Sequence, residues 1–223
     1  MPRYVIRYSK KGTARYIPNL DMMRVLERAM RRANLPVAFS RGFNPHPRIS
    51  IAAPLPVGTE GLAEMAEMEM TRSVEEASLV ERLNAVLPQG LNIREAYLVP
   101  DDAPALMAVL DRAVYMVYID GEDARVELPA GAPGDFMALG RVEVKRRGKD
   151  GRAKIRDIRP GIVSIQVISQ EDGLTMRLEL KTGGSINVRP TEVVAALFEQ
   201  AGLQVDSADI QVTRTGLFPS EKV

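Results

Sequence analysis

The 223-residue chain contains no cysteine and only one histidine, and these scarcities exclude several kinds of chemistry. Without thiolates there can be no cysteine-held iron–sulfur cluster, no thiol nucleophile and no cysteine-ligated zinc. A single histidine also excludes a histidine-rich metal site. We therefore expect no metal and no cofactor, although carboxylate-bound magnesium stays open because its ligands are common side chains.

Long apolar runs are also absent. No stretch of 18 apolar residues occurs, so we expect no membrane-spanning helix. The first residues, 1–8, lack the apolar core of a signal peptide. The absence of cysteine agrees with a reducing compartment, so we expect a cytoplasmic protein. With 45% hydrophobic and 26% charged residues, the composition is that of an ordinary globular protein.

Charge is present but unevenly distributed. Residues 1–58 hold 11 Lys and Arg against 2 Asp and Glu, whereas residues 59–140 hold 5 against 16. Residues 141–223 hold 14 against 11. This asymmetry predicts a basic face for an anionic partner. The alternative is that surfaces of opposite sign pack on each other within the protein.

Apolar periodicity predicts a strand, helix, strand, strand, helix and strand in the first half. We expect Asn19 to cap the first helix, which should end at Leu35 and Pro36. Ser73 should cap the second helix in a capping box with Glu76. The predicted elements span 3–9, 19–33, 48–53, 62–72, 73–87 and 92–99, with a turn at 10–12, brief pairing of 15–17 and an extended piece at 36–39. Their order is that of a ferredoxin-like domain.

After a proline-containing linker at 100–104, the second half can be read as another β/α sandwich of similar type, without an obvious internal sequence repeat. The predicted strands span 113–119, 141–147, 152–159, 162–169, 174–181 and 207–214. The predicted helices span 133–139 and 190–202. Pro190 suits the first turn of the last helix, which should end at Gly202. We therefore predict an α+β fold of tandem ferredoxin-like (βαββαβ) domains, spanning 1–100 and 105–223.

The first helix combines an apolar face with an arginine face. At 100° per residue, one face collects Met22, Met23, Val25, Leu26, Ala29, Met30 and Ala33. Arg24, Arg28, Arg31 and Arg32 fall on the opposite side, with Asp21 among them. Arginine binds phosphates through both charge and bidentate geometry, so this face could track a polyphosphate backbone. The alternatives are a solvated helix face and docking on the acidic middle segment.

A stiff polar loop follows at 40–48. Two X-Pro steps favour extended conformations at Asn44 and His46, and Gly42 permits a sharp turn. The loop should present Arg41, Phe43, Asn44, His46 and Arg48. Phe43 could stack on a base, and His46 could donate to a phosphate or act as a general base. Alternatively, Phe43 anchors a core and His46 has a structural hydrogen-bonding role.

Three further patterns carry weaker indications. The basic hairpin at 141–159, which includes Lys145, Arg146, Arg147 and Lys149, could lie along a nucleic-acid groove or simply be solvated. The glycine-rich turn at 181–185 lacks the spacing of a phosphate-binding loop and indicates a turn. The alternating Glu and Met residues at 64–70 are more typical of an amphipathic strand than of a ligand site.

Several of these motifs resemble one known family. They are Arg15-Tyr16-Ile17-Pro18-Asn19-Leu20-Asp21, Gly42-Phe43-Asn44-Pro45-His46-Pro47-Arg48, Leu55-Pro56-Val57-Gly58, Asp157-Ile158-Arg159-Pro160 and Arg189-Pro190. Together with the arginines of the first helix, they resemble the radical-SAM-linked protein family, a bacterial family of uncharacterised domains encoded beside, or fused to, a cobalamin-binding radical SAM protein. The family commonly has histidine at the position of Asn19, so no role of that histidine applies here.

The resemblance implies a radical SAM protein as partner and RNA or ribosome modification as a pathway. A looser fold analogy links paired ferredoxin-like domains to CRISPR RNA-processing proteins. We therefore expect an RNA-binding accessory protein that positions RNA or a ribosomal substrate for the partner enzyme. Phosphates would be contacted by Lys10, Lys11, Arg15, Arg24, Arg28, Arg31 and Arg32, and a nucleotide by the 40–48 loop.

Two alternatives remain open at this point. One is an RNA-processing or RNA-modifying enzyme that uses His46 or Asp21 as acid or base, although no paired catalytic group supports it. The other is a protein adaptor whose basic face binds an acidic surface of the radical SAM partner.

Overall fold

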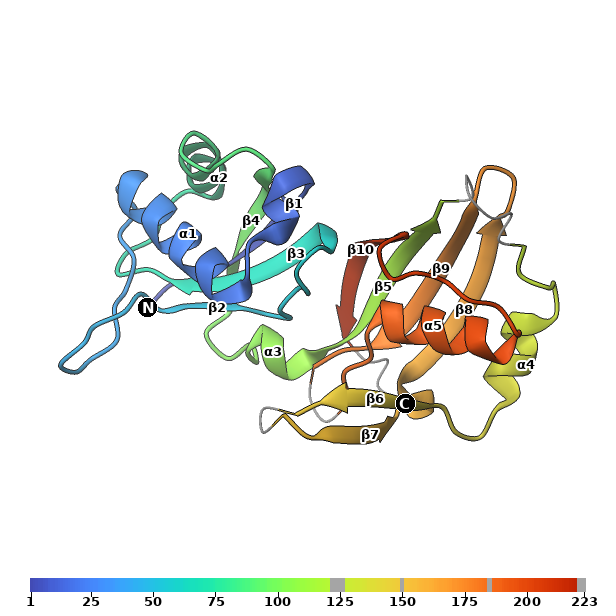
Figure 1. Ribbon diagram of the computed structural model, residues 1–223. Helices are drawn as coiled ribbons and strands as arrows, with labels where there is room; N and C mark the ends of the chain where they lie inside the picture. Colours follow the sequence, from blue (N-terminus) through green and yellow to red (C-terminus); the bar gives the residue numbers. More distant parts are fainter. Residues whose placement is uncertain (121–126, 149–150, 184–185, 220–223) are drawn as a thin grey trace. The chain divides into compact units, whose positions relative to one another are not determined.

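The computed structural model describes residues 1–120, 127–148, 151–183 and 186–219 (Figure 1). The chain divides into two compact units, one of residues 1–110 with 219–223 and one of residues 111–218. Both units mix helices with mostly antiparallel strands, so the protein is α+β, as the alternating sequence pattern predicts. The segment 100–104, expected as a linker, is held by the first unit, because Arg3 Nη2 donates to the Pro100 carbonyl over 3.2 Å and also to that of Ala103.

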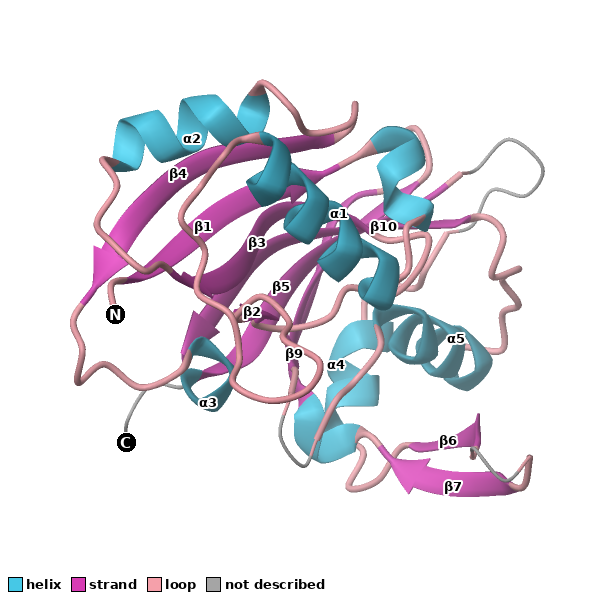
Figure 2. Cartoon of the chain, turned by 90° about the vertical axis from the view of Figure 1, so that its left-hand side faces the viewer, coloured by secondary structure: helices cyan, strands magenta, loops and turns pink. Residues whose placement is uncertain are grey.

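The first unit contains four strands that pair with one another, and two helices that cover one side of these strands (Figure 2). Its strands are β1 (Arg3–Lys10), β2 (Ile49–Ile51), β3 (Glu60–Glu69) and β4 (Leu91–Val99). Their order is β4-β1-β3-β2, and every neighbouring pair is antiparallel. The helices are α1 (Asn19–Arg32) and α2 (Glu76–Asn84), and a single turn, α3 (Leu106–Val109), was not anticipated.

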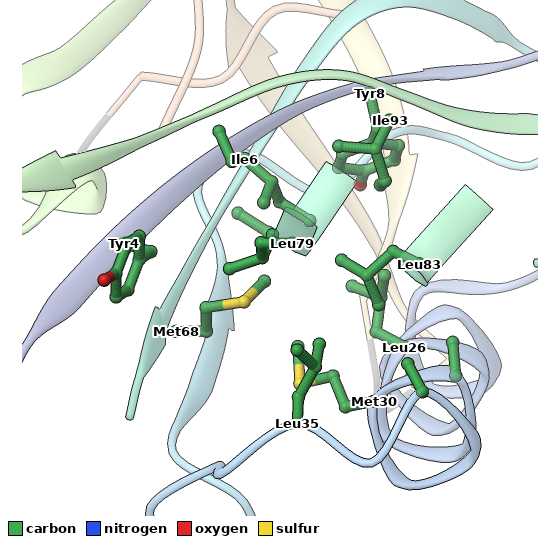
Figure 3. Packing of buried hydrophobic residues seen from close by; sticks show 14 of the residues in the cluster. Tyr4, Ile6, Tyr8, Leu26, Met30, Leu35, Met68, Leu79, Leu83 and Ile93 are labelled. Atoms are coloured by element: carbon green, nitrogen blue, oxygen red, sulfur yellow. The ribbon is translucent and has the colours of Figure 1, made fainter. Parts of the chain in front are cut away.

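The core of this unit lies between the sheet and the two helices (Figure 3). Helix α1 buries Met22, Leu26, Ala29 and Met30, which confirms the apolar face expected from the helical period. Helix α2 contributes Leu79 and Leu83. They pack on Tyr4, Ile6 and Tyr8 of β1 and on Met68 of β3. Close packing of these side chains fixes which face of α1 points outward.

The ends of the helices differ from the expected caps. Pro18, not Asn19, is the N-cap of α1, and its carbonyl accepts the Met22 N–H over 2.8 Å. Glu75 precedes α2, and Ser73 does not cap it. The reason is that the Tyr4 hydroxyl binds both the N–H and the carbonyl of Val74, at 2.9 and 2.8 Å, and so sets the backbone before the helix. Glu76 accepts the Leu98 N–H instead of closing a capping box.

A 3₁₀ helix occupies Gly12–Tyr16, where brief strand pairing of residues 15–17 was expected. The Gly12 backbone N–H donates to Glu60 Oε1 over 2.8 Å, and Gly12 has a φ of +57° that favours glycine. This turn therefore belongs to the approach to α1 and not to the sheet.

The second unit contains β5 (Leu110–Ile119), β8 (Ile162–Ser169), β9 (Leu174–Lys181) and β10 (Ile210–Pro219). The strand order is β10-β5-β9-β8, with β9 antiparallel to both β5 and β8. Helices α4 (Ala132–Ala138) and α5 (Pro190–Gln200) accompany it. Helix α5 begins at Pro190, as expected, and buries Val193, Val194, Leu197 and Phe198.

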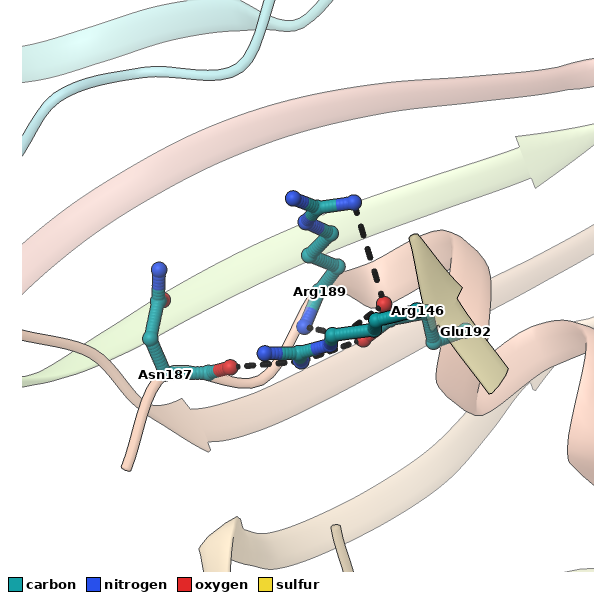
Figure 4. A network of polar contacts seen from close by, with 4 residues as sticks. All are labelled: Arg146, Asn187, Arg189 and Glu192. Carbon is teal, nitrogen blue, oxygen red and sulfur yellow. Dashed lines mark hydrogen bonds and ion pairs between the residues drawn. The ribbon is translucent and has the colours of Figure 1, made fainter. Parts of the chain in front are cut away.

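The expected basic hairpin is present as β6 (Glu143–Arg147) and β7 (Ala153–Asp157), joined to β8 by a 3₁₀ turn at Arg159–Gly161. Its two faces differ, because strand side chains alternate. Arg146 is tied to helix α5: its guanidinium donates twice to the Glu192 carboxylate, at 2.8 and 2.6 Å, and to the Asn187 carbonyl at 2.7 Å (Figure 4). Arg146 therefore holds the hairpin on the unit and is not a free cation.

This anchor gives a stability prediction. Arg146→Met should lower the free energy of unfolding by about 1–2 kcal/mol, because the half-buried bidentate pair is lost. Glu192 then keeps two longer contacts, the ion pair with Arg189 at 3.8 Å and the hydrogen bond from the Arg189 backbone N–H at 3.4 Å. The matched control is Lys145→Met, at an exposed neighbouring position, which should change the urea midpoint little. Equal midpoint shifts for the two variants would contradict the anchoring role.

Candidate nucleic-acid interface

The outer face of α1 carries four exposed arginines, Arg24, Arg28, Arg31 and Arg32. Arg24 pairs with Asp21 over 2.8 Å, and Arg31 pairs with Glu27 over 2.9 Å. The Arg24 and Arg31 side chains stay 67% and 71% exposed, so these pairs stabilise little and can exchange for other anions. Arg28 forms no hydrogen bond or ion pair with any described residue. The helix thus offers cations whose current partners are weak.

A groove runs beside this face. Arg28, Arg31 and Arg32 line it, together with Val25 of the same helix and the segment Val86–Pro88. Arg32 donates to the Val86 carbonyl over 2.6 Å, which holds its guanidinium at the wall of the groove. The groove therefore combines an apolar floor with guanidinium groups, and it could seat an anion together with an apolar or aromatic group.

The cations before α1 are less available than the sequence suggests. Lys10 is buried, with 3% exposure, and its Nζ donates to the Ile17 carbonyl over 2.7 Å. Arg15 is half-buried over the Tyr16 ring, 4.9 Å from its centroid, and lies 3.9 Å from Glu60 Oε1. Lys11 is exposed. Of these three expected phosphate contacts, the structure leaves only Lys11 fully on the surface.

The 40–48 loop closes on itself as a small hairpin. The Ser40 N–H donates to the His46 carbonyl over 2.8 Å, and the His46 N–H donates to Ser40 Oγ over 3.1 Å. Gly42 has a φ of +134°, as the sharp turn requires. Arg41, Phe43, Asn44 and His46 are all exposed, and the Phe43 ring is fully exposed in the described part of the chain. An unpacked phenyl ring at a loop tip is the arrangement that base stacking needs.

His46 is positioned by Ser40 and Asn44, and none of the described acidic side chains pairs with it. Its Nδ1 lies 3.0 Å from the Asn44 carbonyl, which favours a proton on Nδ1 and leaves Nε2 as the acceptor in the neutral ring. Asp21, the other candidate acid or base, pairs with Arg24 on α1. Among the described residues, His46 contacts a backbone carbonyl and Asp21 pairs with an arginine, so the two do not form a catalytic pair.

Beneath the loop lies a second cavity, which we call the loop pocket; its lining includes Arg3, Ser40, His46, Arg48, Glu67 and Glu69. Arg48 pairs with Glu69 over 2.9 Å at its edge. Glu67 is 6% exposed; its Oε2 accepts the Leu106 N–H over 3.0 Å, and its Oε1 lies 3.7 Å from Arg3 Nη1. The Glu and Met alternation at 64–70 predicted the strand β3 but gave no sign that one of its carboxylates would be buried.

Tyr97 lies on the same face of the sheet as Glu67. Val5 of the central strand β1 pairs with Glu67 on β3 and with Tyr97 on β4. Burial raises the pKa of the Tyr97 hydroxyl above its ordinary value, and the nearby Glu95 and Glu67 carboxylates raise it further against the opposing effect of Arg7. This face mixes acidic and basic groups, so a polyanion would find less attraction here than on α1.

On the hairpin of the second unit, Lys145 and Arg147 are exposed, whereas Arg146 is the anchor described above. Lys149 lies outside the described residues. The hairpin therefore offers fewer free cations than its sequence suggests.

The run Asp157–Pro160, which carries part of the family resemblance, has a structural role. Asp157 Oδ1 accepts the N–H groups of Val142 and Arg159, both at 3.0 Å. The Arg159 guanidinium donates to the carbonyls of Met137, Leu139 and Ile162 at 2.6, 3.1 and 3.1 Å. These bonds join the end of α4, the hairpin and the start of β8, so this motif explains folding and not binding.

A family model described as "Uncharacterized protein conserved in bacteria (DUF2344)" matches residues 3–190, and the chain belongs to this family. No curated protein matches the chain. The match says nothing of a radical SAM enzyme.

Two solved structures show distant likeness at 12% identity. A chain of a Cbf5-Nop10-Gar1 complex matches with a TM-score of 0.49, covering 98% of this chain and 50% of that chain, so this chain spans half its length. An unknown protein from Galdieria sulphuraria matches with a TM-score of 0.27, covering 99% of each chain. Neither likeness is close enough to support an argument about function.

Among the described residues, no helix has the length and apolar character needed to cross a membrane. In the same ranges, no three acidic or histidine side chains converge as metal ligands would.

The Asp157 bonds give a pH-dependent prediction. The Val142 N–H holds the pKa of Asp157 below its usual 3.8, and the Arg159 N–H and the Arg141 and Arg159 charges act in the same direction. A depressed folded-state pKa contributes stability that is present above the unfolded pKa and lost as pH falls through the folded pKa.

Asp157→Asn should therefore lower the urea midpoint at pH 7, and the difference from the natural protein should shrink as the pH falls below about 3.8. Urea unfolding at several pH values measures this. The exposed Asp102→Asn serves as control and should show little difference at any of them. A midpoint difference that stays constant down to low pH would contradict the account.

Proposed function

We propose that the protein binds RNA through the outer face of α1 and the adjacent groove, as an accessory protein that positions RNA or a ribosomal substrate for a partner radical SAM enzyme. The observation that carries the proposal is the groove lined by Arg28, Arg31 and Arg32. Exposed guanidinium groups beside an apolar floor suit a strand that presents phosphates and bases together. The radical SAM partner rests on the motif resemblance alone.

We also propose that both units are ferredoxin-like. The orders β4-β1-β3-β2 and β10-β5-β9-β8 support this, because each follows a succession of strand, helix, two strands, helix and strand. In the second unit the β6–β7 hairpin is then an insertion after α4.

The 40–48 loop adds an aromatic contact to the same unit. Phe43 is fully exposed, and Arg41 lies two residues before it. Stacking of a base on such a ring is tolerant of sequence and contributes about 1–3 kcal/mol per base. The arginines of α1 would then supply charge, and the loop would supply stacking.

Neither alternative gains an observation that favours it over RNA binding. An enzyme would need a group that activates His46 or Asp21, and the described contacts of these side chains are a carbonyl and an arginine. An adaptor could use the same arginines for an acidic protein surface, and the experiment below separates it from RNA binding.

Replacing both Arg28 and Arg31 with Ala should weaken binding to single-stranded RNA and flatten its salt dependence. Each lost phosphate contact lowers the slope of log K against log salt by about 0.7, so the double variant should lose about 1.4. Fluorescence anisotropy between 50 and 200 mM salt, roughly the range over which such slopes are resolved, measures this.

The matched control is Arg7→Ala, an exposed arginine on β1 that pairs with Glu95. It should leave the salt slope unchanged. An unaltered salt slope in the Arg28 and Arg31 variant would contradict the RNA proposal. If that variant instead no longer binds an acidic protein, this result would favour the adaptor function.

A further inference from the structure

The groove beside α1 gathers three arginines at one place, because Arg28, Arg31 and Arg32 all line it. They lie three and four residues apart on the helix, a spacing at which like charges repel each other. The described residues that line the groove include no carboxylate. Outside the lining, Glu27 pairs with Arg31 over 2.9 Å and offsets one of the three charges. Two positive charges therefore remain without a counter-charge at this groove.

The three guanidinium groups are free to bind a ligand to different extents. Arg32 donates to the Val86 carbonyl over 2.6 Å, which fixes one side of its planar group at the wall of the groove. Arg28 is exposed and bonds to none of the described residues. The ion pair of Arg31 is exposed and can exchange for another anion. One fixed group and two adjustable ones can therefore meet the same anion.

The rest of the lining is apolar. Val25 of α1 and the segment Val86–Pro88 carry no charge. The groove has a volume of about 480 Å³, which falls within the range of about 300–1,000 Å³ that is usual for small-ligand sites. It has room for a whole nucleotide, with the phosphate at the arginines and the ribose and base against the apolar side chains.

The charge of the groove distinguishes two kinds of phosphate. A phosphate inside an RNA strand is a diester with about one negative charge. A phosphate at the end of a strand is a monoester, with about −1.5 to −2 charges at pH 7 and three strong acceptor oxygens. The monoester matches the two uncompensated charges and the three guanidinium groups, whereas the diester would leave one positive charge in excess. Bonds between guanidinium and phosphate are strong because both partners are charged.

We infer that this groove takes the phosphorylated end of an RNA strand, with the terminal phosphate monoester bound by Arg28, Arg31 and Arg32. The inference rests on the proposed RNA binding and deepens it by naming the part of the strand that the groove holds. A free nucleoside monophosphate offers the same chemistry, so the experiment includes one.

The test compares oligouridylates of equal total charge for binding to the full chain at neutral pH. A pentanucleotide phosphorylated at its 5′ or its 3′ end and a heptanucleotide with hydroxyl ends each carry about six negative charges. At least one phosphorylated pentanucleotide should bind about tenfold more tightly than the heptanucleotide, the size expected for one additional hydrogen bond between charged groups. Total charge cannot produce this difference.

Uridine monophosphate should compete only weakly with the phosphorylated pentanucleotide, because it lacks the rest of the strand and its contact with the 40–48 loop. Competition with equal affinity would show that the groove takes a free nucleotide, and it would overturn the inference of a strand end.

Arg28→Ala should remove most of the preference for the phosphorylated end, because the remaining charge of the groove then matches a diester. The variant should fold, since Arg28 is exposed and bonds to none of the described residues. The matched control is Arg24→Ala, an exposed arginine one turn earlier on α1 that does not line the groove. It should weaken binding of both oligonucleotides alike and keep the ratio near tenfold. Equal loss of the preference in the two variants would contradict the assignment to the groove.

The outcomes separate this inference from the function on which it rests. Arginine-dependent binding with equal affinity for the heptanucleotide and for both phosphorylated pentanucleotides would overturn the preference for a strand end and leave the RNA proposal standing. No binding of any of the three would overturn both.

Discussion

The packing of α1 on the sheet of the first unit is the contact on which the candidate interface depends. Met22, Leu26 and Met30 are buried against β1 and β3, and burial of such side chains stabilises by about 1.5–3 kcal/mol each. Once these residues face inward, the helical period turns Arg28 and Arg31 outward. The arginine face is thus a geometric consequence of the core.

Contacts within the protein decide which basic side chains remain available. Lys10 and Arg146 carry charges that the sequence presents as equivalent to those of Arg28 and Arg31. Lys10 donates to the Ile17 carbonyl, and Arg146 binds a carboxylate and a carbonyl of the α5 region. Charge density along the chain therefore overstates the cationic surface. The motif at Asp157–Pro160, which is part of the family resemblance, behaves in the same way. Its Asp157 and Arg159 side chains form hydrogen bonds within the second unit and are therefore not available to a partner.

Sequence periodicity predicted the elements whose side chains pack on one face. The apolar face of α1, the β8–β9 hairpin and the start of α5 at Pro190 follow directly from alternation, helical period and proline chemistry. Sequence alone could not predict features set by distant partners. Tyr4, about 70 residues away in the chain, displaced the expected Ser73 cap. The sequence around Glu67 shows only alternation, and it does not predict that this carboxylate is buried, because its burial depends on Arg3 and Leu106. Local rules fail where long-range contacts determine the environment.

The proposed function requires that the first unit contact RNA through α1 and the 40–48 loop. Ultraviolet crosslinking in cells, followed by sequencing of the bound RNA and mass spectrometry of the adducts, tests this most directly. The account predicts RNA adducts on peptides that contain residues 24–32 and 41–48. Absence of crosslinked RNA, together with a protein partner retained after nuclease treatment, would contradict it and leave the adaptor function in its place.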